Sequence, residues 1–112
     1  MHNPTGWQNI DGNPFPLENR TFLASPVDYV DTWHALEALV KENKTHSIGV
    51  SNFNSYQIDR IVKEAKSVLP VTNQIEVNPY VTNVDVIKTC HKHNITITAY
   101  SPLGNPSKPE VS

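Results

Sequence analysis

The sequence predicts an α/β protein built on a parallel sheet. Three short runs rich in apolar and β-branched residues begin near positions 47, 71 and 95, so they recur about every 24 residues. Between successive runs, apolar residues repeat at helical spacing. A strand, a helix and a parallel strand form the usual right-handed β-α-β unit. The spacing is compatible both with an open doubly wound sheet and with a section of an eightfold barrel, since both use this unit.

The chain divides into a long N-terminal loop and a region of β/α units. Residues 2–25 are expected to form the loop, because prolines, glycines and asparagines interrupt any helical or strand pattern there. Residues 26–112 are expected to hold the β/α units. Loops of this length inside a compact domain are usually functional or disordered.

The first helix is predicted from capping residues and an apolar stripe. Ser25 is the expected N-cap, Pro26 suits the first turn, and Asp28 stands three residues after the cap as in a capping box. Asn43 is the expected stop. The apolar face is predicted to contain Val30, Trp33, Leu36, Leu39 and Val40.

Strands are predicted at residues 47–51, 71–77 and 95–100, each followed by a turn or cap signal. Asn54 and Ser55 offer caps for the helix after the first of these strands. The expected apolar residues of the two intervening helices are Ile58, Ile61, Val62 and Ala65 for the first, and Val86, Ile87 and Cys90 for the second.

Composition excludes several classes of partner. The formal net charge is −2 and charged residues make up 18% of the chain, too weak a field to recruit nucleic acid. No apolar run approaches the roughly 20 residues of a membrane-spanning helix. Cys90, the single cysteine, fits a reducing compartment, so a cytoplasmic protein is expected.

The ends of the predicted strands are unusually polar. The first strand ends in Ser51 and Asn52, the second carries Asn73-Gln74 and Glu76, and the third ends in Tyr100-Ser101. Ligands bind beyond the carboxyl ends of parallel strands. A hydroxyl, amides and an aromatic ring suit a flat ring with a carboxamide, such as nicotinamide. From residue types alone, the same groups could equally cap the helices that follow.

Four motifs in order resemble those of the aldo-keto reductases. Residues 47–54 (SIGVSNFN) resemble the family's IGVSNF element, and residues 73–80 (NQIEVNPY) are similar to NQxExHPY. Residues 99–104 (AYSPLG) match AYSPLG, and residues 2–6 (HNPTG) look like HWPxG. The resemblance covers essentially the whole chain.

This resemblance implies a partial (β/α)8 barrel, roughly strands 4 to 7 with the intervening helices, and makes residues 1–112 part of one reductase domain. It implies an NADPH-dependent oxidoreductase that reduces small aldehydes or ketones to alcohols and is usually monomeric. Carried over by position, His2 is the catalytic histidine that orients the carbonyl oxygen. The residues that the resemblance assigns to the cofactor are Ser51, Asn52 and Gln74 at the carboxamide, Tyr100 stacked on the nicotinamide, and Ser101, Leu103 and Asn105 at the pyrophosphate.

Several positions depart from the family pattern. Asn3 replaces the usual tryptophan, so the lining of the substrate pocket does not transfer. Asn78 replaces the common histidine before proline, without removing a cofactor contact. His91 and His93 are two residues apart and point in different directions on a helix, which favours surface histidines over a metal site.

The family's catalytic tyrosine, lysine and aspartate belong upstream of His2 in the pattern. The chain is therefore expected to be a fragment that lacks them, marginally stable and inactive when expressed alone. The alternative is a non-catalytic truncated form that acts as a weak nucleotide- or partner-binding module.

Overall fold

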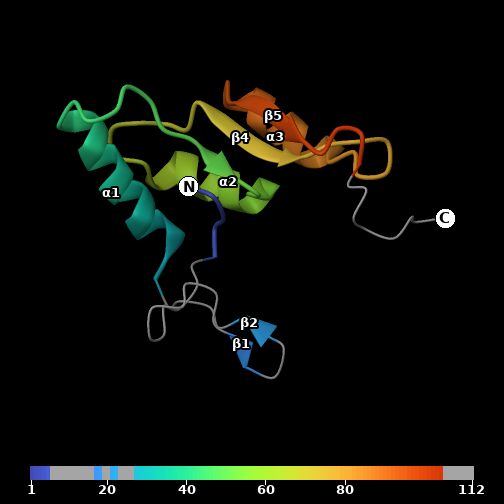
Figure 1. Ribbon diagram of the computed structural model, residues 1–112. Coiled ribbons are helices and arrows are strands. Elements are labelled where there is room, and N and C mark those ends of the chain that lie inside the picture. Colours follow the sequence, from blue (N-terminus) through green and yellow to red (C-terminus); the bar gives the residue numbers. More distant parts are fainter. Residues whose placement is uncertain (6–16, 19–20, 23–26, 105–112) are drawn as a thin grey trace.

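The computed structural model describes residues 1–5, 17–18, 21–22 and 27–104. Figure 1 shows how the elements are arranged. In chain order they are β1 (Leu17–Glu18), β2 (Thr21–Phe22), α1 (Tyr29–Lys41), β3 (Val50–Ser51), α2 (Ser55–Glu64), β4 (Thr72–Glu76), α3 (Val84–Lys92) and β5 (Thr96–Tyr100).

Strands β3, β4 and β5 form a parallel sheet in that order, with α2 and α3 as the crossovers between them. The register pairs Ser51 with Gln74 and Glu76 with Tyr100. Strand β3 is shorter than the predicted 47–51, although the carbonyl of Ile48 still accepts from the Val71 N–H at 3.0 Å. The predicted α/β class is confirmed as a three-stranded parallel sheet with alternating helices.

The two faces of the sheet differ in chemistry. Successive side chains of a strand point to opposite faces, and Asn73 and Ile75 of β4 are buried while Gln74 between them is exposed. Thr98 and Tyr100, on the face of Gln74, are also exposed. The buried apolar cluster on the helix side contains Val30, Trp33, Ile48, Val50, Phe53, Ile58, Ile61, Cys90 and Ile95.

The start of the first helix corrects the sequence prediction. Helix α1 begins at Tyr29, and its N-cap is Asp28, whose carboxylate accepts the Val30 N–H at 3.1 Å. Asp28 is also bound by Arg60 of α2 through both terminal guanidinium nitrogens, at 2.9 and 2.5 Å. The predicted cap, Ser25, and Pro26 lie outside the described residues. The predicted stop is confirmed, because Asn43 takes φ +58° just after the helix.

The region expected to be an unstructured loop contains paired backbone. Within residues 2–25, β1 and β2 pair antiparallel, Leu17 with Phe22 and Glu18 with Thr21. Strands of two residues are too short to show the alternation from which strands are predicted. The sequence pattern therefore could not reveal them.

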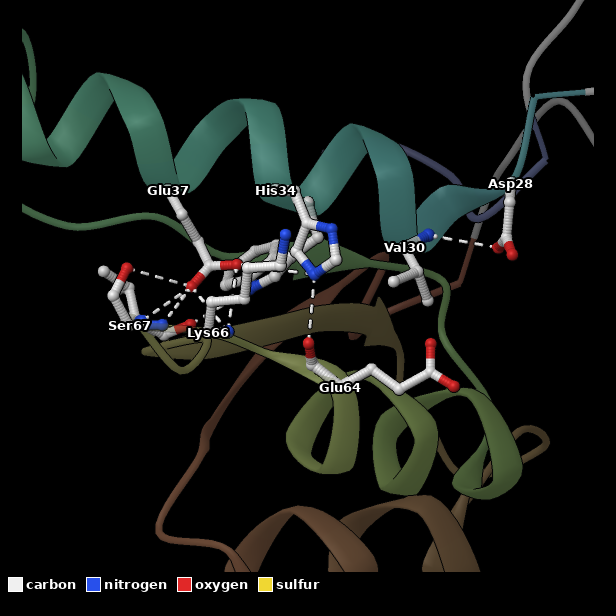
Figure 2. Close-up of polar contacts among 9 residues, drawn as sticks. Asp28, Val30, His34, Glu37, Glu64, Lys66 and Ser67 are labelled. Atoms are coloured by element: carbon white, nitrogen blue, oxygen red, sulfur yellow. Dashed lines mark hydrogen bonds and ion pairs between the residues drawn. The ribbon is translucent and has the colours of Figure 1, made fainter.

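A buried carboxylate joins α1 to the segment that leads into β4 (Figure 2). Glu37 accepts the backbone N–H groups of Lys66 at 3.0 Å, of Ser67 at 2.5 Å and of Val68 at 2.9 Å. The indole N–H of Trp33 donates to the Val68 carbonyl at 3.0 Å. These contacts fix the first helix against the entry to the central strand.

Helix α2 is anchored immediately after the polar end of β3. Asn54, its N-cap, accepts the Gln57 N–H at 2.9 Å, and the Gln57 side chain accepts the Asn54 N–H at 2.9 Å. This reciprocal capping box confirms the predicted start of the helix. It also fixes the direction of the chain just beyond Ser51 and Asn52.

Candidate functional site

The carboxyl ends of the three parallel strands bring the predicted site residues together. Ser51 pairs with Gln74 across β3 and β4, and its hydroxyl donates to the Gln74 carbonyl at 2.6 Å. The Asn52 N–H donates to the same carbonyl at 3.0 Å. Tyr100 of β5 reaches over β4 and donates its hydroxyl to Asn52 Oδ1 at 2.6 Å. Four of the predicted residues therefore form one contiguous group at this edge of the sheet.

Asn52 is the centre of this group. It takes φ +60°, a left-handed conformation that asparagine tolerates better than most residues. Its Nδ2 lies within hydrogen-bond distance of the His2 carbonyl at 3.0 Å and of Asn3 Oδ1 at 3.0 Å. Asn52 therefore links the HNPTG segment to the strand ends, and the contact of Asn3 was not predicted from the sequence. The only sequence signal for it was the departure of Asn3 from the family's tryptophan.

Gln74 offers the most accessible amide of the group. Its side chain is exposed on the helix-free face of β4 and has no hydrogen-bond partner among the described residues. The hydroxyl proton of Ser51 is committed to the Gln74 carbonyl, and its oxygen accepts from Asn52 Nδ2 at 3.2 Å, which leaves one lone pair as an acceptor. An amide and a hydroxyl oxygen can hydrogen-bond a ligand carboxamide, and the neighbouring aromatic ring can stack on the ring that bears it. The side chains present therefore fit the nicotinamide end of a dinucleotide.

A small cavity of about 190 Å³ opens beside this group. Asn52, Glu76 and Tyr100 are among the side chains that line it, together with apolar groups from the helix side. Pockets that enclose a whole small ligand usually measure roughly 300–1,000 Å³. At about 190 Å³, the cavity formed by the described residues is smaller than such a pocket.

The chain turns sharply after β5. Ser101 takes φ +49° and Gly104 takes φ +83°, and the Gly104 N–H donates to the Ser101 carbonyl at 2.9 Å. The side chain of Leu103 is 99% exposed at the tip of this turn. Asn105, the last residue predicted for the pyrophosphate, lies outside the described residues.

The two other polar residues of β4 named in the sequence analysis lie on opposite faces of the sheet. Asn73 is fully buried on the helix side, where its amide binds the Phe53 carbonyl at 3.0 Å and the Phe53 N–H at 3.4 Å. Glu76 keeps its place on the side of Gln74 and receives the Asn78 amide at 3.2 Å. Asn73 thus ties β4 to the turn after β3, a structural role that the sequence did not separate from that of Gln74.

His2 lies at the margin of the group. Its carbonyl is held by Asn52 at 3.0 Å, while its side chain is exposed. The imidazole ring has no hydrogen-bond partner in the part of the chain that the structure describes. The structure therefore places the His2 backbone beside the strand ends and leaves the ring available.

Two titratable groups away from the strand ends, Cys90 and His93, have structural partners. Burial raises the pKa of the Cys90 thiol, against a smaller lowering effect of its hydrogen bond from Asn73. His93 Nε2 lies 2.7 Å from Asp59 Oδ1 between α3 and α2.

Across the described ranges, no group of three or more His, Cys, Asp or Glu side chains is arranged to hold a metal ion. No helix in those ranges is both long and apolar enough to cross a membrane.

A sequence model of the aldo/keto reductase family matches residues 1–109. The chain belongs to the aldo/keto reductase family. Among its family relatives, Aldo-keto reductase family 1 member A1 of Homo sapiens is 41% identical over 109 residues, which is 96% of this chain and 33% of that protein. Member A1-A of Danio rerio is 48% identical over 84 residues, or 75% of this chain and 26% of that protein.

Solved structures of the family have the same fold over the matched region. The aldose reductase of Giardia lamblia superposes with a TM-score of 0.87 at 34% identity, covering 94% of this chain and 34% of that protein. The aldose reductase of Schistosoma japonicum superposes with a TM-score of 0.85 at 35% identity, covering 97% of this chain and 36% of that protein. The chain thus spans about a third of the length of these aldo/keto reductases.

Proposed function

We propose that this chain supplies the nicotinamide-binding part of an NADPH-dependent reductase that converts small aldehydes or ketones to alcohols. The observation that carries the proposal is the contiguous group at the sheet edge, in which Ser51, Asn52, Gln74 and Tyr100 are joined by hydrogen bonds of 2.6 to 3.0 Å. Its residue types match a ring that bears a carboxamide. Membership of the aldo/keto reductase family supports the same reaction class.

In this proposal each member of the group has one task. The Gln74 amide and the acceptor lone pairs that remain on Ser51 Oγ and Asn52 Oδ1 hold the carboxamide, and the exposed ring of Tyr100 stacks on the nicotinamide. The Tyr100 hydroxyl already binds Asn52 Oδ1, so the ring and the amide are fixed relative to each other. Holding the ring in one orientation limits which of its faces meets the substrate. NADPH, when bound, supplies the hydride.

His2 and the turn after β5 complete the proposed assignment. The available imidazole of His2 hydrogen-bonds the carbonyl oxygen of the substrate and orients it. The loop that contains Ser101, Leu103 and Asn105 wraps around the cofactor's pyrophosphate. The family's tyrosine, which provides the proton, and the lysine and aspartate that raise its acidity belong to a part of the pattern upstream of His2. We place the chain at roughly strands 4 to 7 of the complete barrel, in a monomeric cytoplasmic enzyme.

Equilibrium binding of nucleotide fragments to the chain tests the proposal. NADP⁺ and nicotinamide mononucleotide are expected to bind, whereas adenosine 2′,5′-bisphosphate is expected not to compete, because the described group recognises only the nicotinamide end. Gln74→Leu removes the accessible amide and is expected to weaken the binding of both nicotinamide ligands about tenfold. This is the usual effect of losing hydrogen bonds between uncharged groups.

Asn94→Gly is the matched control for the loss of an amide. Asn94 takes φ +59°, which glycine adopts without strain, and it lies at the opposite end of β5 from Tyr100. Its replacement is expected to leave binding unchanged. Equal binding of the adenosine fragment, or an undiminished affinity in Gln74→Leu, would contradict the proposed site.

A further inference from the structure

Asn78, in the turn after β4, uses the full hydrogen-bonding capacity of its amide. Its Oδ1 accepts the N–H groups of Tyr80 at 2.9 Å and Val81 at 3.0 Å. Its Nδ2 donates to Glu76 Oε1 at 3.2 Å and to the Ser101 carbonyl at 3.3 Å. A primary amide has two donors and two acceptor lone pairs. Asn78 is only 9% exposed, so these contacts are largely shielded from water.

The bond to Ser101 connects two strand ends that are far apart in the sequence. The Ser101 carbonyl also accepts the Gly104 N–H at 2.9 Å and so closes the turn after β5. Ser101 takes φ +49°, a region that residues with side chains seldom adopt and that surrounding contacts must maintain. The Asn78 amide, in the turn after β4, binds this carbonyl.

The histidine common at this position in the family pattern could not make all four contacts. A neutral imidazole has one donor and one acceptor, whereas a protonated imidazole has two donors and no acceptor. With either form, at least two of the four groups bound by Asn78 would need other partners. The fourfold contact is thus a property of the asparagine in this chain.

We propose that Asn78 is a positioning residue for the cofactor's pyrophosphate, acting through the turn of residues 101–104. This inference rests on the proposed function, in which that turn wraps around the pyrophosphate. Asn78 itself does not touch the cofactor. It fixes the Ser101 carbonyl, and with it the direction in which the backbone of the turn faces.

The test compares three variants of the full chain. Asn78→Ala removes all four contacts, and Asn78→His keeps at most two. The matched control is Asn83→Gly, which removes a different amide at the same end of β4. The Asn83 amide donates to the Glu76 carbonyl at 2.6 Å and not to Ser101, and its φ of +47° suits glycine.

Two measurements are made on each variant. Amide hydrogen exchange at Gly104 reports directly on closure of the turn. The affinities for NADP⁺ and for nicotinamide riboside, which has no phosphate, separate the pyrophosphate contact from the ring contact. The second measurement also distinguishes a positioning role from a general loss of stability, which would weaken both ligands alike.

Asn78→Ala is expected to speed exchange at Gly104 and to weaken NADP⁺ binding at least about fivefold, while the affinity for nicotinamide riboside stays the same. Asn78→His should change the exchange rate at Gly104 and the affinity for NADP⁺ in the same directions but by less. This variant keeps the test usable if the alanine variant does not fold. Asn83→Gly should leave the ratio of the two affinities unchanged. Unaltered exchange at Gly104, or an equal loss for both ligands, overturns the inference. If the parent chain binds neither ligand, the proposed function fails. Independently of ligand binding, slow exchange at Gly104 that persists in Asn78→Ala would overturn the positioning role.

Discussion

Glu37 shows how a single residue can depend on backbone far away in the sequence. It lies four residues after Trp33 on the buried side of α1 and is only 4% exposed. Burial alone would raise the pKa of this carboxyl group, but the N–H groups of Ser67, Val68 and Lys66 outweigh it and leave the pKa below its ordinary value. The charged form is therefore the one that the fold stabilises.

We predict that Glu37→Ala lowers the free energy of unfolding by about 2 to 3 kcal/mol at neutral pH, because buried N–H groups lose their acceptor. The folded-state pKa is depressed, so this contribution is present above the unfolded-state pKa of about 4.3 and is lost as the pH falls through the lower folded-state value. Urea unfolding at neutral and acidic pH measures both effects. The difference between the parent chain and Glu37→Ala should shrink in acid.

Glu42→Gln is the control for the loss of a carboxylate. Glu42 is the C-cap of α1, the helix that contains Glu37. Glu42 is exposed, and its ion-pair partner among the described residues is exposed Lys44 at 3.2 Å. The stability change is expected to stay within about 0.5 kcal/mol. A difference between the parent chain and Glu37→Ala that is the same at both pH values would contradict the proposed role of the Glu37 charge.

At the scale of elements, the approach of β3 to β4 depends on a residue without a side chain. A Cβ atom added at Gly49 would lie 3.0 Å from Thr72 Cγ2 and 3.0 Å from the Thr72 carbonyl oxygen. The first contact is with a side chain, but the second is with backbone in the first residue of β4. The glycine of the SIGVSNFN motif therefore sets the spacing of the two strands just before Ser51.

We predict that Gly49→Ala destabilises the chain by about 1 to 3 kcal/mol through overpacking. Adding Thr72→Ser, which removes the Cγ2 methyl, should recover only part of this loss because the carbonyl contact remains. Ser47→Ala, at an exposed position in the same segment, should change the stability by less than about 0.5 kcal/mol. Chemical denaturation of the four proteins checks these values, and complete recovery in the double variant would show that the backbone contact is unimportant.

At the scale of the whole molecule, the three-stranded sheet has helices against one face and polar side chains on the other. In the Giardia lamblia aldose reductase, the matched region is 34% of that protein, and the two structures superpose with a TM-score of 0.87. The chain therefore corresponds to about a third of such a protein. In the proposed function, the remaining two thirds would provide the other side of the ligand site.

We predict that a chimera in which this chain replaces the matched third of the Giardia lamblia enzyme reduces aldehydes with NADPH. The reason is that the strand-end group would meet the complementary part of the barrel. A Gln74→Leu chimera should raise the KM for NADPH, whereas an Asn94→Gly chimera should not. The measurement is the initial rate of NADPH oxidation with and without aldehyde. A folded chimera that does not bind NADPH would refute the prediction.

The sequence by itself determined the order of strands and helices from α1 onward and the residues that meet at the edge of the parallel sheet. Apolar periodicity placed β4, α2, α3 and β5 within a few residues of their observed bounds. The spacing of the motifs placed Ser51 and Tyr100 at strand ends and Gln74 within the strand between them, and parallel pairing then brings these residues together. These features follow from local pattern, because a strand or helix reflects the residues within its own segment.

The tertiary structure decided what depends on partners distant in the sequence. Asp28 rather than Ser25 caps α1, and the Arg60 that holds Asp28 is 32 residues away. The neighbours Asn73 and Gln74 have similar chemistry but opposite environments, and only packing of the helices on one face of the sheet distinguishes them. Asn78 acquires its contact with Ser101 across 23 residues. Such contacts are specified by the packing of the whole chain, so no local pattern in the sequence reports them.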